Sequence, residues 1–136
     1  MPPDVELVRQ WIERARTDLR SAEHALCAKP PLTEDACVHA QQAVEKSLKA
    51  FLVHRDIEFE WSHRIRYLLN LCAQRDPAFA QWRDEAEPLT EYAVQFRYPH
   101  PDPPPTAGES QIALHIARRV HQFVLERLPA EVRPSS

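Results

Sequence analysis

Residues 37–52 read CVHAQQAVEKSLKAFL, and this stretch decides the fold class of the chain. Its apolar side chains recur at steps of three and four residues, which is the spacing of one face of an α-helix. Thr33 can cap such a helix, and Glu34 and Asp35 suit the positive end of its dipole. The pattern predicts a helix that starts at Thr33 and runs to about His54. Its apolar face consists of Cys37, Ala40, Val44, Leu48 and Phe51.

A second face of this helix combines small side chains with polar ones. Its members are Ala36, His39, Ala43, Lys46 and Ala50. Because small side chains let another backbone come close, we expect this face to pack against a helix of the same chain or of a second copy. His39 is then expected to form a hydrogen bond between helices.

Outward from this helix, the same periodicity predicts further helices on both sides. Asp4 and Ser62 are suited to cap the first and third helices, and Asp18 is expected on an outer face of the first. Asp76 is suited to cap a fourth helix, which Pro88 should kink or split. The other helices are expected over residues 4–28, 63–75 and 109–128.

The fold class follows from these helices together with the scarcity of glycine. One glycine in 136 residues argues against β folds rich in hairpins. Residues 99–105 contain five prolines and should form an extended, stiff loop. We therefore predict an all-α, up-and-down bundle of four to five helices over residues 1–128, with a disordered tail at residues 129–136.

The composition also excludes several classes of function. Gly108 alone cannot form a glycine-rich phosphate loop, and no uncharged run is long enough to cross a membrane. The net charge of -3 means that binding to nucleic acid would need a local basic patch. The N-terminus lacks the apolar run of an export signal, so a cytoplasmic location is expected.

The cysteines and histidines do not follow the spacing of a metal site. Cys27, Cys37 and Cys72 form no CxxC pair and are expected to be buried, reduced thiols. No HExxH motif or repeated Glu-x-x-His pair occurs in the chain. We therefore expect neither a metal nor a cofactor.

Four strings in the chain resemble the HEPN domain family (higher eukaryotes and prokaryotes nucleotide-binding). They are WIERARTDLRSAEHAL at residues 11–26, the stretch at residues 37–52, HRIRYLLNL at residues 63–71 and LTEYAVQFRYP at residues 89–99. The resemblance spans roughly residues 7–128. It is closest to small bacterial and archaeal members that are often encoded beside a minimal nucleotidyltransferase.

The resemblance implies a helical bundle that commonly forms a homodimer and is associated with nucleotide binding. Many members are metal-independent ribonucleases that act as toxins or defence effectors, with an arginine and a histidine separated by four to six residues. Here only two residues separate Arg97 from His100. Arg97, Tyr98 and Pro99 match the RYP of the nucleotidyltransferase-linked branch, which often lacks the nuclease signature.

The chemistry of these residues leaves alternatives open. Arg97 suits a bidentate phosphate contact, or it is a cation that complements the dipole of the preceding helix. His100 is the candidate proton carrier, or it is solvated between two prolines. Tyr98 is a candidate for stacking on a base.

The two central helices add further candidates. Lys46 and Lys49 could form a basic strip for nucleotide phosphates, or they are solvated helix lysines. Gln42 could contact a base edge and His63 an adenine, or both make hydrogen bonds between helices.

The leading hypothesis is a nucleotide- or RNA-binding HEPN protein that partners a minimal nucleotidyltransferase in a toxin–antitoxin-like pair. One alternative is a metal-independent RNA endonuclease, a toxin that uses Arg97 and His100. The other is a protein–protein adaptor without a ligand.

Overall fold

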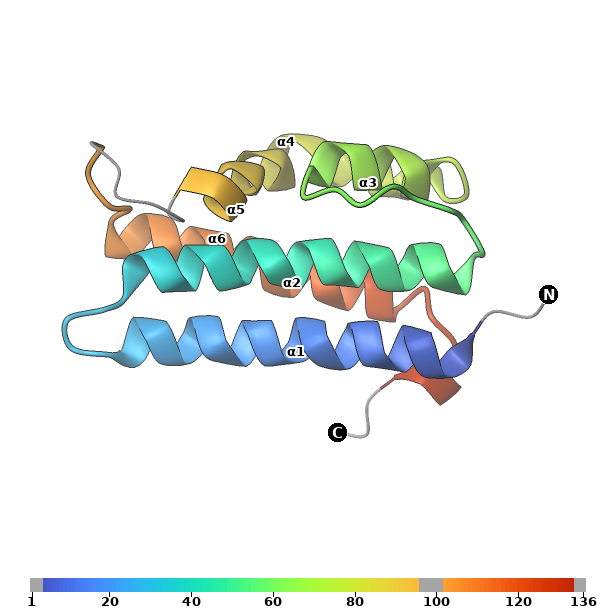
Figure 1. The fold of residues 1–136 in the computed structure, drawn as a ribbon, viewed down its shortest axis with the longest axis horizontal. Coiled ribbons are helices and arrows are strands. Elements are labelled where there is room, and N and C mark those ends of the chain that lie inside the picture. The colour runs from blue at the N-terminus through green and yellow to red at the C-terminus, as the bar shows by residue number, and fades with distance from the viewer. Residues whose placement is uncertain (1–3, 96–101, 134–136) are drawn as a thin grey trace.

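A long antiparallel helix pair forms the base of the molecule. The computed structural model describes residues 4–95 and 102–133, without the side chains of residues 94 and 95. Helices α1 (Val5–Cys27) and α2 (Thr33–His54) lie side by side and form the most extensive contact between elements (Figure 1). Asp4 caps α1 as predicted, because its carboxylate accepts a hydrogen bond from the Leu7 backbone N–H at 3.0 Å.

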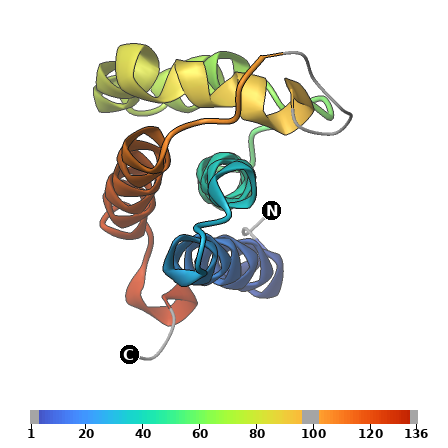
Figure 2. The same cartoon turned by 90° about the vertical axis from the view of Figure 1, so that its left-hand side faces the viewer.

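A broken helical segment and a long C-terminal helix complete the bundle. Figure 2 shows α1, α2 and α6 nearly end-on, with the segment from α3 to α5 lying across one side of α2 and α6. The described residues contain no strand, so the predicted all-α bundle is confirmed. The elements after α2 are α3 (Ile65–Ala73), η1 (Pro77–Trp82), α4 (Arg83–Ala86), η2 (Glu87–Glu91), α5 (Tyr92–Gln95), α6 (Ala107–Leu125) and η3 (Ala130–Val132).

Prolines break the middle segment into short turns, as predicted from the sequence. Asp76 caps η1 by accepting a hydrogen bond from the Ala78 backbone N–H at 3.0 Å, and Pro77 follows at the first position. Pro88 lies in the first turn of η2, where its missing N–H costs no helical hydrogen bond. The predicted single fourth helix is therefore a series of 3-10 and α turns.

Two predicted caps are wrong. Thr33 is the first residue of α2, and Leu32 stands at the cap position without a side-chain hydrogen bond. Ser62 lies three residues before α3 and accepts a hydrogen bond from the Arg64 backbone N–H instead. Within the predicted tail, Val132 of η3 is buried against the core, and residues 134–136 lie outside the described residues.

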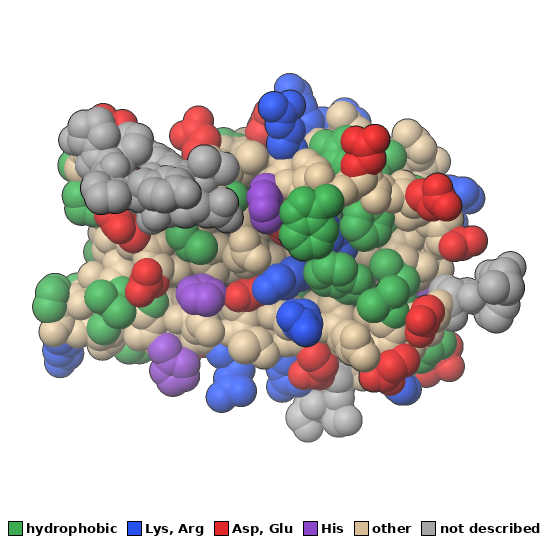
Figure 3. Space-filling view, viewed as in Figure 1, with side chains coloured by type: hydrophobic (Ala, Val, Ile, Leu, Met, Phe, Trp, Pro, Cys, Tyr) green, Lys and Arg blue, Asp and Glu red, His purple; other side chains and the backbone are tan. Residues whose placement is uncertain are grey.

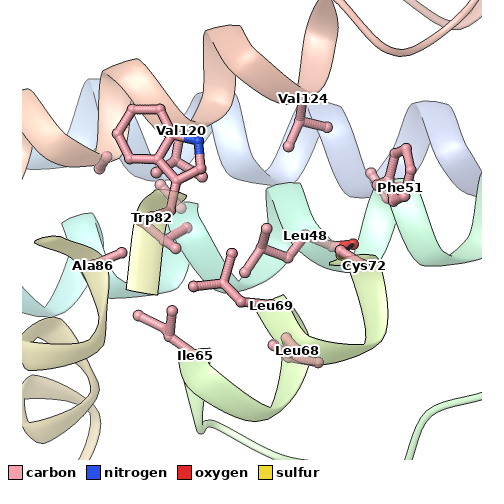
Figure 4. Close-up of a cluster of buried hydrophobic side chains, with 14 of the residues drawn as sticks. Leu48, Phe51, Ile65, Leu68, Leu69, Cys72, Trp82, Ala86, Val120 and Val124 are labelled. Carbon is pink, nitrogen blue, oxygen red and sulfur yellow. Dashed lines mark hydrogen bonds between the residues drawn. The ribbon is translucent and has the colours of Figure 1, made fainter. Parts of the chain in front are cut away.

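The core lies between α2, the middle segment and α6. Figure 4 shows side chains from these elements pointing toward one another. Cys37 and Cys72 belong to this core, and burial raises the pKa of both thiols. Cys27 is exposed, so its predicted burial is wrong. The labelled core residues are Leu48, Phe51, Ile65, Leu68, Leu69, Cys72, Trp82, Ala86, Val120 and Val124.

The alanine face of α2 packs within the same chain. Ala36, Ala43 and Ala50 are fully buried, and His39 and Lys46 on this face both contact Asp18 of α1. The face is therefore covered by α1 and is not available to a second copy of the chain.

Replacing Ala43 by leucine is expected to destabilise the protein by about 1–3 kcal/mol, because added methylene groups have no room at a close helix contact. Urea unfolding measures this loss. The same substitution at exposed Ala107, in the first turn of α6, serves as a control and should leave stability nearly unchanged. Equal stability of the Ala43 variant and the wild type would contradict the close packing.

A buried histidine links α6 to α2. Ser47 donates a hydrogen bond to the Ala43 carbonyl at 2.7 Å, so the His121 Nδ1–H, at 3.0 Å, donates to the Ser47 oxygen. Burial, with a smaller contribution from the charge of Arg16, lowers the pKa of His121 to about 4. The folded protein therefore holds this imidazole neutral.

The stability of the protein should fall on mild acidification, because the imidazole of His121 takes up a proton more readily in the unfolded chain. With a pKa lowered from 6.5 to about 4, the loss is about 2 kcal/mol between about pH 7.5 and about pH 5. Urea midpoints across this range measure it. His121→Gln should flatten the dependence, and an unchanged slope would exclude His121 as its source.

Candidate functional site

Polar side chains gather where α1, α2 and the connection at residues 55–64 meet. Figure 3 shows histidine, basic and large hydrophobic side chains together over the middle of α2 on this face. We call this group the α2 polar cluster. Its members are Asp18, His39, Gln41, Gln42, Glu45, Lys46, Lys49 and His63.

The inner half of the cluster is a buried ion pair. The Lys49 ammonium lies 2.6 Å from a Glu45 oxygen, and their side chains are 1% and 4% exposed. Gln41 donates to the same carboxylate at 2.9 Å, and the His63 Nδ1 lies 3.0 Å from it. Burial alone would raise the pKa of Glu45, but hydrogen bonds from Lys49, His63 and Gln41 outweigh it and lower that pKa. The carboxylate is therefore ionised.

Aromatic rings enclose the ammonium of Lys49. Its nitrogen lies 4.4 Å from the ring centre of Trp61, 5.5 Å from that of Trp11 and 6.0 Å from that of Phe59. The negative face of an aromatic ring attracts a cation, most strongly when water is excluded. Trp61 itself is 77% exposed, so it covers Lys49 while remaining in contact with solvent.

The outer half of the cluster is centred on Asp18. One oxygen of its carboxylate lies 2.8 Å from the His39 Nδ1, and the other accepts from the Lys46 ammonium at 2.6 Å. Asp18 is buried, while the side chains of His39 and Lys46 are 39% and 22% exposed. Its expected position on an outer face is wrong, because α2 covers it.

His39 and His63 share one arrangement. An ionised carboxylate only accepts hydrogen bonds, so each Nδ1 carries a hydrogen and donates to Asp18 or Glu45. Within residues 4–95 and 102–133, the Nε2 atoms have no hydrogen-bond partner. When an imidazole held in this way carries a hydrogen on Nε2 as well, that nitrogen donates a hydrogen bond to an anion.

The structure joins some of the predicted site residues and separates others. His63 and Lys46 lie in the α2 polar cluster, and half-buried Gln42 donates to the Gln41 side-chain oxygen at 3.2 Å. The expected basic strip of Lys46 and Lys49 is wrong, because the Lys49 ammonium is buried in the protein against Glu45. The candidates Arg97, Tyr98 and His100 lie outside the described residues.

The predicted hydrogen bond of His39 between helices is confirmed, with Asp18 as its partner. Sequence reasoning did not identify Asp18, Glu45 or Trp61 as site residues. A signal for Asp18 existed, since it stands at a helical step between Ala15 and Ala22 on the apolar face of α1. Trp61 carried no such signal, because it lies outside any helix.

Two further properties bear on the chemistry of the molecule. Among the described residues, no group of three or more His, Cys, Asp or Glu side chains is placed to hold a metal ion. None of the helices in the described part of the chain has the length and apolarity needed to cross a membrane.

The protein is an all-α bundle in which carboxylates hold His39 on the central helix and His63 in the connection that follows it. A family model for the HEPN domain matches residues 8–128, so the chain belongs to the HEPN domain family. It is similar to a solved protein, described as the crystal structure of TT1696 from Thermus thermophilus. The identity is 34% and the TM-score 0.72, over 89% of this chain and 98% of that chain. No match was found among curated proteins.

The buried ion pair predicts a non-additive response to substitution. Glu45→Gln leaves the Lys49 ammonium buried without its counter-charge, and Lys49→Met does the same to the carboxylate, so each should cost about 3–5 kcal/mol. The double variant should lose less than the sum of the two. Unfolding in urea gives the three values, and simple additivity would show that the two groups do not interact.

Proposed function

We propose that this HEPN protein binds the phosphate of a nucleotide or RNA at the α2 polar cluster. We further propose that it acts in the cytoplasm as a homodimer and as the partner of a minimal nucleotidyltransferase in a toxin–antitoxin-like pair. The observation that carries the binding proposal is the pair of carboxylate-held, part-exposed imidazoles of His39 and His63, with Lys46 bound to the same carboxylate as His39.

The charge balance of the cluster supports an anionic ligand. The charges of Asp18 and Glu45 cancel those of Lys46 and Lys49, so the net charge of the cluster depends on its imidazoles. A phosphate at the Nε2 atoms brings negative charge to a cluster whose fixed charges cancel, and an imidazolium there would give it a charge-assisted hydrogen bond.

The RYP string supplies a second set of candidate ligands. Arg97 and Tyr98 follow α5 in the sequence, and α5 contacts α2. A guanidinium suits a bidentate phosphate contact and a phenol ring suits a base. The alternative of RNA cleavage by Arg97 and His100 draws on the same string.

ATP and a short single-stranded RNA should both bind the wild-type protein, because each carries the phosphate for which this site is proposed. His63→Gln should weaken binding roughly 10-fold or more, the loss expected for a charge-assisted hydrogen bond. Isothermal titration calorimetry measures the affinities. His115→Gln, at an exposed position on α6, is the matched control.

If the wild-type chain binds neither ligand, the binding proposal is wrong. RNA that is shortened by the purified protein in EDTA would instead favour the endonuclease alternative, particularly if His100→Ala abolishes the cleavage. Light scattering tests the homodimer, and co-purification with the product of a neighbouring nucleotidyltransferase gene tests the partner.

A further inference from the structure

Trp61 is a highly exposed aromatic side chain whose ring still contacts Lys49 and His63. Its 77% exposure is the largest among the exposed large hydrophobic side chains of the described residues. A single exposed hydrophobic residue needs no explanation by itself. Trp61 differs because it lies against charged groups of the α2 polar cluster that are themselves held in place.

The inner side of the indole faces a cation that cannot move away. The Lys49 ammonium lies 4.4 Å from the ring centre and is tied to Glu45 at 2.6 Å. Because Lys49 is buried, it marks the side of Trp61 that faces the protein, and the opposite side faces solvent. The indole is therefore oriented before any ligand arrives, which lowers the entropy that a ligand must lose on binding.

His63 connects this ring to the candidate phosphate site. The centres of the Trp61 and His63 rings are 6.0 Å apart and the rings are nearly perpendicular, at 78°. The same imidazole reaches Glu45 through its Nδ1 at 3.0 Å. A ligand with a flat aromatic group on Trp61 would thus hold its neighbouring anionic group close to His63.

The cation also affects which aromatic group suits the outer face. An ammonium on one face of an indole draws π-electron density toward itself, which leaves the opposite face less attractive to a second cation. An electron-poor face stacks well with a large, electron-rich ring, and among the nucleobases the purines have the larger ring system.

We propose that the outward face of Trp61 is a stacking platform for the purine base of a nucleotide or of single-stranded RNA. The proposal rests on the proposed function, since the phosphate of the same ligand would contact His63 and Lys46. It adds a base-binding group to that site and a preference for purines over pyrimidines.

The test compares ATP, UTP and inorganic tripolyphosphate on the wild type, Trp61→Ala and Trp61→Phe. Trp61→Ala removes the ring on which the base stacks, so this variant should bind ATP between about 5-fold and 150-fold more weakly than the wild type. Trp61→Phe keeps a smaller ring and should lose less ATP affinity. Tripolyphosphate, which has no base, should bind the wild type and Trp61→Ala equally. ATP should also quench the fluorescence of the wild type, and much less that of Trp61→Phe, which keeps Trp11 and Trp82.

Ile112→Ala is the matched control, because Ile112 is also a large exposed hydrophobic side chain, at 62%, but lies on α6. It should leave ATP affinity unchanged. If tripolyphosphate binds, but the wild type and Trp61→Ala bind ATP with equal affinity, the stacking platform is wrong and the proposed phosphate site is retained. Equal affinities of the wild type for ATP and UTP would overturn the purine preference. Failure of every ligand to bind the wild type would overturn the proposed function as well.

Discussion

Helix α2 is surrounded by other elements on almost every side, yet it carries polar and charged side chains into the interior. Gln41, Glu45, Ser47 and Lys49 are all buried. A buried polar group without a partner costs several kcal/mol, and a buried charge costs more, so each of these groups needs a partner. Much of the remaining structure follows from this constraint.

The partners come from α2 itself and from two neighbouring parts of the chain. The connection between α2 and α3 supplies His63 to Glu45 and Trp61 to Lys49, and α6 supplies His121 to Ser47. The ion pair of Glu45 and Lys49 can then remain charged without water, because further hydrogen bonds satisfy the carboxylate. Polar contacts of this kind depend on geometry, so they orient the connection and α6 relative to α2 more specifically than apolar packing would.

The same contacts create the surface on which function is proposed. A carboxylate that must be satisfied holds the part-exposed imidazole of His63 by Nδ1 and leaves its other nitrogen without a hydrogen-bond partner among the described residues. Asp18 does the same for His39 from the α1 side. The carboxylates that hold the buried charges thus also hold the imidazoles of the proposed binding surface.

The sequence by itself determined the all-α class, the extent of α1 and α2, and the break of the fourth helix at its prolines, because helical periodicity and proline act locally along the chain. It also pointed to the bond between helices at His39. Only the tertiary structure decided that Lys49 and Asp18 are buried, since helical spacing shows which residues share a face and not what covers that face. The position of Trp61 over Lys49 was also decided only by the tertiary structure. Trp61 lies in a connecting segment, which has no helical period from which the direction of a side chain can be predicted.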